Sequence, residues 1–415
     1  MHLCVAVIES LRMKKTTDNA PRKLVVVGGG FAGISLVRHL ASDPHYQVTL
    51  ISDSDHFRYY PLLYSTATGH TRVAASFPVR SLLADRPEVA FVQARLKRID
   101  TEKHVMYAED GSEYPYDTAA LALGMVTNYF NIPGLKEHSF GTKSIEQALQ
   151  LRRHLHSEML KHGKHGYACV VVGGGPTGVE LSAAMMAYLR RVARRHGLPQ
   201  DKMKVYLVES GPRVLRFLPE SGSARVARRL QKLGVTVMAG NVVAAQTADS
   251  VTVGSKEIST NTVVWTAGVS NNPLYADNAC FTVGERGRIK ADPYLMAAPD
   301  VYVLGDNVAT PYAGLAETAV SNGKYLAKQL HRIADGKHAH PYHPHNPISV
   351  VPVGDGWAVA SYRRLVLTGR LASWLRHVAD LIGFLDVAPL PMAVSLWLTD
   401  HTVEDDCPDC RRRGH

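Results

Sequence analysis

The chain has 415 residues, enough for a large core and two or three domains, with the 46% hydrophobic and 20% charged content of an ordinary globular protein. Its net charge of +10 suits nucleic acid, anionic lipid or anionic cofactors, but no nucleic-acid-binding motif accompanies the charge, so we expect no nucleic-acid partner. The five cysteines form no secreted disulfide framework, which favours a reducing, cytoplasmic location.

Residues 1–22 form a polar lead without the long apolar region and cleavage site of a signal peptide. Met13 opens a second candidate start, and our hypothesis is that translation begins there. No apolar run reaches 18 residues without charges, so the sequence predicts no membrane-spanning helix.

The stretch "LVVVGGGFAGIS", residues 24–35, predicts a buried strand, a glycine turn and a helix. Its glycines Gly28, Gly30 and Gly33 follow the spacing G-x-G-x-x-G. In this pattern the first glycine allows a tight turn, and the second lets the backbone approach a pyrophosphate. The third lets helix and strand pack closely, while the phosphates lie on the helix N-terminus. A dinucleotide is therefore expected at this turn.

A second strand pattern, "YQVTLISDSDHF", ends in acidic residues. We predict that Asp53 accepts hydrogen bonds from an adenosine ribose, with Asp55 or a merely solvated turn as alternatives. A β-meander with a hairpin turn at Asp110-Gly111 follows. The run "TAALALG" then returns to the parallel sheet and brings Gly124 close to the cofactor.

The glycine motif recurs about 145 residues later in "CVVVGGGPTGVE", with Gly173, Gly175 and Gly178. Two copies, each between a strand pattern and a helix pattern, predict two dinucleotides, or one dinucleotide and a flavin. The following strand "KVYLVES" ends at Glu209. A carboxylate there holds both ribose hydroxyls and repels a 2′-phosphate, which favours NADH over NADPH.

The remaining candidate sites lie nearer the C-terminus. Asp306, between a strand and a long helix, is placed to accept from flavin ribityl hydroxyls. The histidines of residues 334–347, His338, His340, His343 and His345, alternate with prolines, so we interpret that stretch as a solvated loop and predict no metal site. The pair Cys407 and Cys410 could be a redox pair, half of a metal site or without a role, and we leave these alternatives open.

Residues 371–385 carry apolar side chains at three- and four-residue spacing, with Ser373, Arg376, His377 and Asp380 on the opposite face. Pro389 and Pro391 interrupt this pattern before "MAVSLWL". Two interpretations are open. The segment is a C-terminal helix docked on the body, or an interfacial element that rests on a bilayer with Trp374 and Trp397 as anchors.

With these motifs in order, residues 23–398 resemble the type II NADH dehydrogenases, single-subunit NADH:quinone oxidoreductases of the two-dinucleotide-binding flavoprotein superfamily. The resemblance is carried by "VVVGGGFAGIS", "PLLYSTATG", "TNYFNIPG", "GTKSIEQALQLRR", "VVVGGGPTGVELSAAM", "VYLVESGPRVL", "VVWTAGV", "YVLGDNVA" and "HVADLIGF". It implies an α/β fold with two Rossmann-like, glutathione-reductase-like dinucleotide-binding domains and a C-terminal amphipathic segment. It also implies hydride transfer from NADH to FAD and electron transfer to ubiquinone or menaquinone without proton pumping.

The resemblance and the motifs together give a set of candidate residues. For FAD they are Gly28, Gly30, Phe31, Ala32, Gly33, Asp53, Gly124, Gly305 and Asp306, and Gly268 is a further cofactor-binding candidate assigned to neither dinucleotide. For NADH they are Gly173, Gly175, Pro176, Thr177, Gly178, Glu180 and Glu209. The candidate catalytic residues are Glu180, which matches a glutamate near the nicotinamide in the family, and Glu317.

Two departures from the family pattern fall where quinone should meet flavin. The motif A-Q-x-A-x-Q appears as "AETAVS", with Glu317 and Ser321 in place of glutamines, and Tyr60 replaces a glutamine or threonine before "PLLY". We hypothesise that Glu317 relays a proton to the acceptor. The alternatives are a soluble NADH-dependent reductase with another acceptor, a sulfide:quinone oxidoreductase-like enzyme, and a nucleotide-binding regulatory protein. The sulfide reading lacks a suitably placed cysteine pair.

The predicted organisation has four parts. An FAD-binding domain comprises residues 23–135 and 266–345, and an NADH-binding domain comprises residues 136–265. The polar lead covers residues 1–22, and a C-terminal hairpin with a membrane-association segment covers residues 346–415. We expect a peripheral protein held by that last segment to an anionic surface, at the cytoplasmic face of the cell membrane. A homodimer is left as an open alternative.

Overall fold

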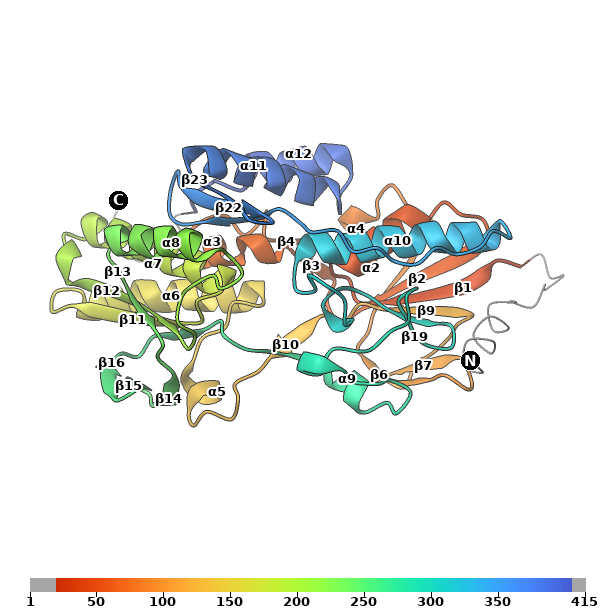
Figure 1. Ribbon diagram of the computed structural model, residues 1–415, viewed down its shortest axis with the longest axis horizontal. Helices are drawn as coiled ribbons and strands as arrows, with labels where there is room; N and C mark the ends of the chain where they lie inside the picture. The colour runs from red at the N-terminus through yellow and green to blue at the C-terminus, as the bar shows by residue number, and fades with distance from the viewer. Residues whose placement is uncertain (1–19, 405–415) are drawn as a thin grey trace.

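Two parallel sheets, one in each half of the molecule, organise the computed structural model, which describes residues 20–404 (Figure 1). The first sheet has the order β19-β20-β9-β1-β2-β5 and is parallel except for β19 at its edge. Its strands are β1 (Arg22–Val27), β2 (Tyr46–Ser52), β5 (Ala90–Gln93), β9 (Thr118–Leu121), β19 (Met296–Ala298) and β20 (Val301–Val303). The central strands β1 and β9 are buried along nearly their whole length, as a parallel sheet covered on both faces requires.

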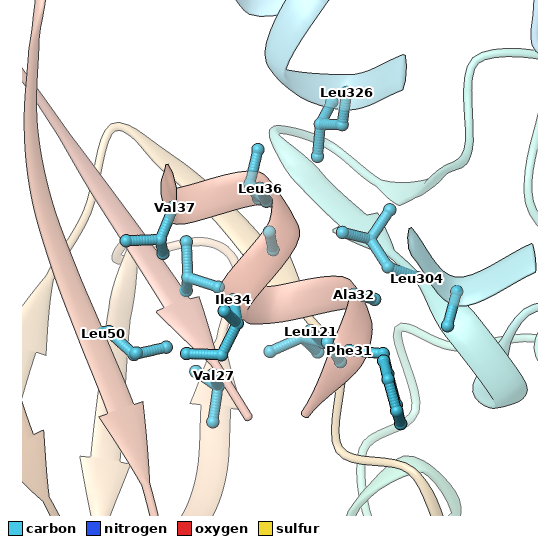
Figure 2. Close-up of a cluster of buried hydrophobic side chains, with 14 of the residues drawn as sticks. Val27, Phe31, Ala32, Ile34, Leu36, Val37, Leu50, Leu121, Leu304 and Leu326 are labelled. Atoms are coloured by element: carbon cyan, nitrogen blue, oxygen red, sulfur yellow. The ribbon is translucent and has the colours of Figure 1, made fainter. Parts of the chain in front are cut away.

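Helices α2 (Phe31–Leu40) and α10 (Ala316–Ala334) pack against each other beside this sheet (Figure 1). Figure 2 shows Ile34 and Leu36 of α2 among side chains from β1, β2, β9 and α10. Gly323 makes the close approach of the two helices possible, because an added Cβ there would lie 2.8 Å from the Leu36 backbone nitrogen.

The second sheet has the order β13-β12-β11-β17, all parallel. Its strands are β11 (Tyr167–Val172), β12 (Met203–Glu209), β13 (Val235–Ala239) and β17 (Val263–Trp265), and its helices are α6 (Ile145–His162), α7 (Pro176–Arg195) and α8 (Glu220–Leu233). The two sheets with their helices confirm the predicted α/β fold class.

Three small antiparallel sheets are attached to these units. They are formed by β3 (His56–Arg58) with β4 (Ser76–Pro78); by β6 (Leu96–Asp100), β7 (Val105–Ala108) and β8 (Glu113–Pro115); and by β14 (Val243–Gln246), β15 (Ser250–Val253) and β16 (Lys256–Ser259). The predicted turn at Asp110-Gly111 joins β7 to β8, with Gly111 at a φ of +88°. Short helices complete these regions: η1 (Tyr60–Leu62), α3 (Leu63–Ala67), α4 (Val79–Leu82), α5 (Leu135–His138), η2 (Gln200–Lys202), α9 (Pro273–Ala276), η3 (Glu285–Gly287) and η4 (Gly305–Asn307).

The chain passes between the two units at a two-stranded antiparallel ladder, visible near the centre of Figure 1. It is formed by β10 (Met125–Thr127), which leaves the first unit, and β18 (Val269–Asn271), which returns to it. The outgoing and returning segments therefore lie side by side.

The C-terminal elements cover one side of both units, at the top of Figure 1. They are a sheet of β21 (Ser349–Pro352), β22 (Ala358–Tyr362) and β23 (Leu365–Gly369), followed by α11 (Arg370–Leu385) and α12 (Leu390–Thr399). Pro391 lies in the first turn of α12, where its missing N–H costs no helix hydrogen bond. None of the helices within residues 20–404 combines the length and apolarity needed to span a membrane.

Helix α11 turns its predicted polar side inward and much of its apolar side outward. Leu371 and Trp374 are both 59% exposed, whereas Asp380 is buried and Arg376 is nearly so. Of the two predicted anchors, Trp374 is exposed, but Trp397 is half-buried and donates its indole N–H to the His377 carbonyl oxygen at 2.9 Å. Trp397 thus attaches α12 to α11.

Candidate active site

The first glycine turn joins β1 to α2, and the space around each of its three glycines differs. Gly28 has a φ of +113°, and an added Cβ would overlap the Ala122 carbonyl oxygen of β9's continuation. An added Cβ on Gly33 would overlap the carbonyl oxygen of Gly28 itself. At Gly30 an added Cβ meets nothing within 4 Å. The first and third glycines are therefore needed by the fold, and the second leaves space above the helix N-terminus.

The second glycine turn, between β11 and α7, repeats this division of roles. Gly173 has a φ of +115° and packs against Thr266, and an added Cβ on Gly178 would overlap the Gly173 carbonyl oxygen. Gly175 again has open space, and the neighbouring Pro176 and Thr177 are exposed. Both turns thus present free backbone N–H groups at a helix N-terminus, with room for a pyrophosphate close to the chain.

Glu209 ends β12 beside the second turn. Its carboxylate accepts hydrogen bonds from the backbone N–H of Gly174 at 2.7 Å and of Gly211 at 2.6 Å. These bonds fix the carboxylate at the strand end, where a ribose bound to the turn would meet it.

The residue that occupies the equivalent position in the first unit is Ser52, not Asp53. The first glycine of each turn donates its N–H to the neighbouring strand: Gly28 to the Ile51 carbonyl oxygen and Gly173 to that of Val208. Ser52 follows Ile51 as Glu209 follows Val208, so the two residues occupy equivalent positions. Asp53 lies beyond the strand with a side chain 43% exposed, within 4.0 Å of Arg58 and 3.4 Å of Arg95. Its ribose role stays a prediction.

Asp306 lies in η4, between β20 and α10, as predicted. It accepts from the Gly314 backbone N–H at 3.1 Å, and burial raises the pKa of its carboxyl while Arg288 opposes that shift. The preceding Gly305 has a φ of +69° and donates to the Asn322 side-chain oxygen at 2.9 Å.

Asn307 ties this corner to the strand that carries Gly124. Its side chain accepts from the Gly124 N–H at 2.8 Å and donates to the Gly124 carbonyl oxygen at 2.7 Å. Lys143, which the sequence analysis did not single out, donates to the Met125 carbonyl oxygen at 3.2 Å. Burial lowers the pKa of its amine to about 8, and the charge of Asp306 opposes that shift.

Glu180 is buried on α7 and forms an ion pair that crosses to α11. Arg376 lies 3.2 Å from the Glu180 carboxylate and 2.7 Å from that of Asp380, and it also donates to the Pro61 carbonyl oxygen. Burial raises the pKa of Glu180 to about 7, although the Arg376 charge opposes the shift. The pattern of α11 marks Arg376 only as part of a polar face, and no sequence signal indicates its pairing with Glu180.

Glu317 and Ser321 lie in the first two turns of α10 and line a small hollow, too tight for a water molecule, together with Thr318, Tyr342, His345 and Pro347. Burial raises the pKa of the Glu317 carboxyl, and the nearby His345 opposes this. Tyr60, the other departure from the family pattern, is 45% exposed in η1. The structure therefore places Glu317 and Ser321 one helical turn apart at the same hollow.

Three further candidates have structural roles. Phe31 and Ala32 are buried in the core, and Phe31 packs edge-on against Phe57 with ring centroids 5.1 Å apart. Gly268 precedes the returning strand β18, and an added Cβ there would overlap the Asn128 carbonyl oxygen.

The two cysteines within residues 20–404 are both free. Cys169 is buried in β11, and burial raises the pKa of its thiol to about 12, so it is an unreactive core residue. Cys280 lies in the first unit and is half-buried. The pair Cys407 and Cys410 and the candidate start Met13 lie outside the described residues.

Comparison with known proteins agrees with this geometry. The sequence pattern of the pyridine nucleotide-disulphide oxidoreductase family matches residues 22–323. A type II NADH:quinone oxidoreductase of Staphylococcus aureus is 26% identical over 382 residues, covering 86% of this chain and 94% of that protein.

Two solved structures share the fold at low sequence identity. NDH2 from Plasmodium falciparum in complex with NADH superposes with a TM-score of 0.81 at 17% identity, over 91% of this chain and 97% of that one. The sulfide:quinone oxidoreductase of Aquifex aeolicus gives a TM-score of 0.76 at 16% identity, over 93% and 100% of the two chains.

Proposed function

Because the chain belongs to the pyridine nucleotide-disulphide oxidoreductase family, we propose that it is an FAD-dependent enzyme that oxidises NADH and reduces a membrane quinone. The observation that carries the proposal is the repeated turn geometry, in which Gly30 and Gly175 each leave open space above a helix N-terminus. Two adenine dinucleotides fit two such turns. The curated relatives named type II NADH:quinone oxidoreductase support this choice of reaction.

FAD, when bound, supplies the hydride acceptor and electron carrier of the reaction. The first turn would hold its pyrophosphate, and Asp306 would accept from its ribityl hydroxyls. The second turn with Glu209 would hold NADH. The work of the chain is to bind and orient the two groups, since hydride transfer between stacked rings depends mainly on positioning.

The overall reaction, NADH + H⁺ + quinone → NAD⁺ + quinol, takes one proton from the solution. Glu317 is the group that we assign to deliver it, because it lines the same hollow as Ser321 and His345, at the start of the helix that follows Asp306. Burial raises the pKa of this carboxyl, which favours a protonated acid that donates. The reaction contains no step that moves a proton across a membrane.

The C-terminal elements support a peripheral attachment. The outward side of α11 and α12 exposes large apolar residues, which a water-soluble surface does not require. They are Leu371, Trp374, Ile382, Leu390 and Leu398. We assign this side to the lipid surface, with the enzyme at the cytoplasmic face of the cell membrane, where NADH is available.

The test is anaerobic. The FAD-loaded protein is reduced with NADH, a water-soluble quinone is added, and flavin reoxidation is followed by absorbance. Fast reoxidation supports the proposal. Full reduction by NADH without any response to ubiquinone or menaquinone analogues would favour the alternative, a reductase with another acceptor.

Glu317→Gln tests the proton relay in the same assay, with the exposed Glu88→Gln as matched control. We expect quinone reduction by Glu317→Gln to be slowed about a hundredfold or more, the lower range for general acid catalysis. Reduction by NADH should be unchanged. Full quinone turnover at every pH would remove Glu317 from the mechanism.

A further inference from the structure

One side of α8 carries only positive charge. Arg225, Arg228, Arg229 and Lys232 follow the i, i+3, i+4, i+7 spacing that places side chains on one face of a helix, while Val226 and Leu230 are buried on the other. These four cations line an open groove of about 360 Å³. Trp357, just before β22, and Thr368 of β23 also line it, and the C-terminal sheet lies above α8 in Figure 1.

No carboxylate is among the residues that line this groove. Within residues 20–404, none of the four cations lies in an ion pair with an acidic side chain. Like charges at i+3 and i+4 destabilise a helix by about 0.2–0.5 kcal/mol for each pair. The arrangement therefore opposes helix stability, which is typical of residues retained for a ligand.

Part of the groove is held in place by the fold. Arg229 donates from Nε to the Val353 carbonyl oxygen at 3.2 Å and from a terminal nitrogen to that of Asp355 at 3.3 Å. Its guanidinium carbon lies 5.9 Å from the centre of the Trp357 ring. The backbone carbonyls and the indole thus fix one cation, while Arg228 and Lys232 are exposed beside it.

We propose that this groove binds a multiply charged phosphate group. Guanidinium groups pair with phosphate oxygens through paired hydrogen bonds, and a lysine adds a point charge. Several cations on one wall suit a ligand with two or more negative charges rather than a single carboxylate. The Thr368 hydroxyl adds a neutral donor to the groove. Such a phosphate is carried by a soluble diphosphate or by an anionic lipid headgroup.

The groove is separate from both glycine turns, and its occupancy does not depend on quinone reduction. The strand β23, which supplies Thr368, leads directly into α11, whose exposed Leu371 and Trp374 we assign to the lipid surface. A bound phosphate, whether from a soluble diphosphate or from a lipid headgroup, would therefore connect the NADH-binding unit to the C-terminal elements.

Two binding measurements separate the sources. Both use the FAD-loaded protein saturated with NAD⁺, so that neither dinucleotide site accepts the probe. Isothermal titration calorimetry with inorganic pyrophosphate tests the soluble source. Flotation with phosphatidylcholine vesicles, with and without phosphatidic acid, tests the lipid source. The variant is Arg228→Gln/Lys232→Gln, and the control is Lys204→Gln/Lys256→Gln, which removes two exposed charges elsewhere.

We expect the groove variant to weaken binding in one of the two assays by at least about tenfold, through the loss of two charge-assisted interactions. The control should bind as the wild type does. Loss confined to pyrophosphate identifies a soluble ligand, and loss confined to phosphatidic acid vesicles identifies a headgroup. Equal effects of the groove and control variants, or no binding in either assay, would overturn the proposal.

Discussion

Arg376 of α11 lies 3.2 Å from the carboxylate of Glu180 on α7, although 196 positions separate the two residues. The pair joins the C-terminal helix to the first turns of the helix that follows the second glycine turn. Because Asp380 shares the same guanidinium at 2.7 Å, one cation compensates two buried carboxylates. The position of α11 is thus linked electrostatically to the NADH-binding unit.

Replacing Arg376 by methionine should strongly destabilise the protein. The change leaves two buried carboxylates without a cation, and breaking a buried pair in this way costs about 3–5 kcal/mol. The measurement is the thermal unfolding midpoint of the FAD-loaded protein. Arg370→Met, at the exposed start of α11, is the matched control. Adding Glu180→Gln to Arg376→Met should recover part of the loss, and a double variant no more stable than the single one would contradict the pairing.

Asp400 should make stability depend on pH near neutrality. Its side chain is fully buried, its carboxylate oxygens have no hydrogen-bond partner, and His401 lies 3.1 Å away outside hydrogen-bonding geometry. Burial, followed by the charge of Asp380, raises the pKa of Asp400 to about 7, while the charges of His377 and Arg376 oppose this. A raised acid pKa stabilises the fold at low pH, and the contribution is lost as pH rises through 7.

Asp400→Asn should therefore raise the unfolding midpoint more at pH 8.5 than at pH 5.5, because only part of the contribution has been lost at the lower pH. Thermal unfolding at the two pH values, with wild type beside it, measures the difference. An equal shift at both values would show that the carboxyl does not titrate in this range.

Two neighbouring glycines should separate folding from NADH binding. An added Cβ on Gly178 would overlap the Gly173 carbonyl oxygen, so Gly178→Ala should cost about 1–3 kcal/mol of stability through overpacking. The methyl group added by Gly175→Ala meets no protein atom within 4 Å, so this variant should have the same unfolding midpoint as the wild type. Its Kd for NADH should nevertheless rise at least about tenfold, because the methyl group occupies the pyrophosphate position. Unchanged NADH affinity in Gly175→Ala would show that the dinucleotide lies elsewhere.

Glu209 should determine the preference for NADH over NADPH. Its carboxylate is held by two backbone N–H groups at the end of β12, so its negative charge opposes a 2′-phosphate. Glu209→Gln keeps the shape and removes the charge. We expect the ratio of kcat/KM for NADH to that for NADPH to fall about tenfold or more, a change of about 1.4 kcal/mol in relative binding. Glu137→Gln, an exposed change on α5, should leave the ratio unaltered.

The glycine turns could be predicted from sequence because their constraints are local. The positive φ at Gly28 and the close approach at Gly33 both arise within six residues of chain, and both require glycine. A short sequence motif is therefore enough to identify them. The ribose-binding position could not be fixed as well. A strand end is uncertain by a residue or more from pattern alone. The hydrogen bonds of the two glycine turns show that Ser52, one residue before Asp53, takes the position that Glu209 takes in the second unit.

The orientation of α11 could not be predicted for a different reason. An amphipathic pattern identifies two faces but does not say which one meets the protein, because that depends on charges far away in sequence. Arg376 and Asp380 are turned inward because Glu180 on α7 supplies a partner there. Only the folded chain brings these three residues together.

The ladder of β10 and β18 marks the two points where the chain leaves the first unit and returns to it. Residues 128–268 leave and return through paired neighbours, and every strand of the six-stranded sheet lies outside that range. The buried residues of the first core likewise stop at Ala122 and resume at Leu274. The second unit is thus inserted within the chain of the first, so its two ends are held together by strands that belong to the entry and exit of the insertion.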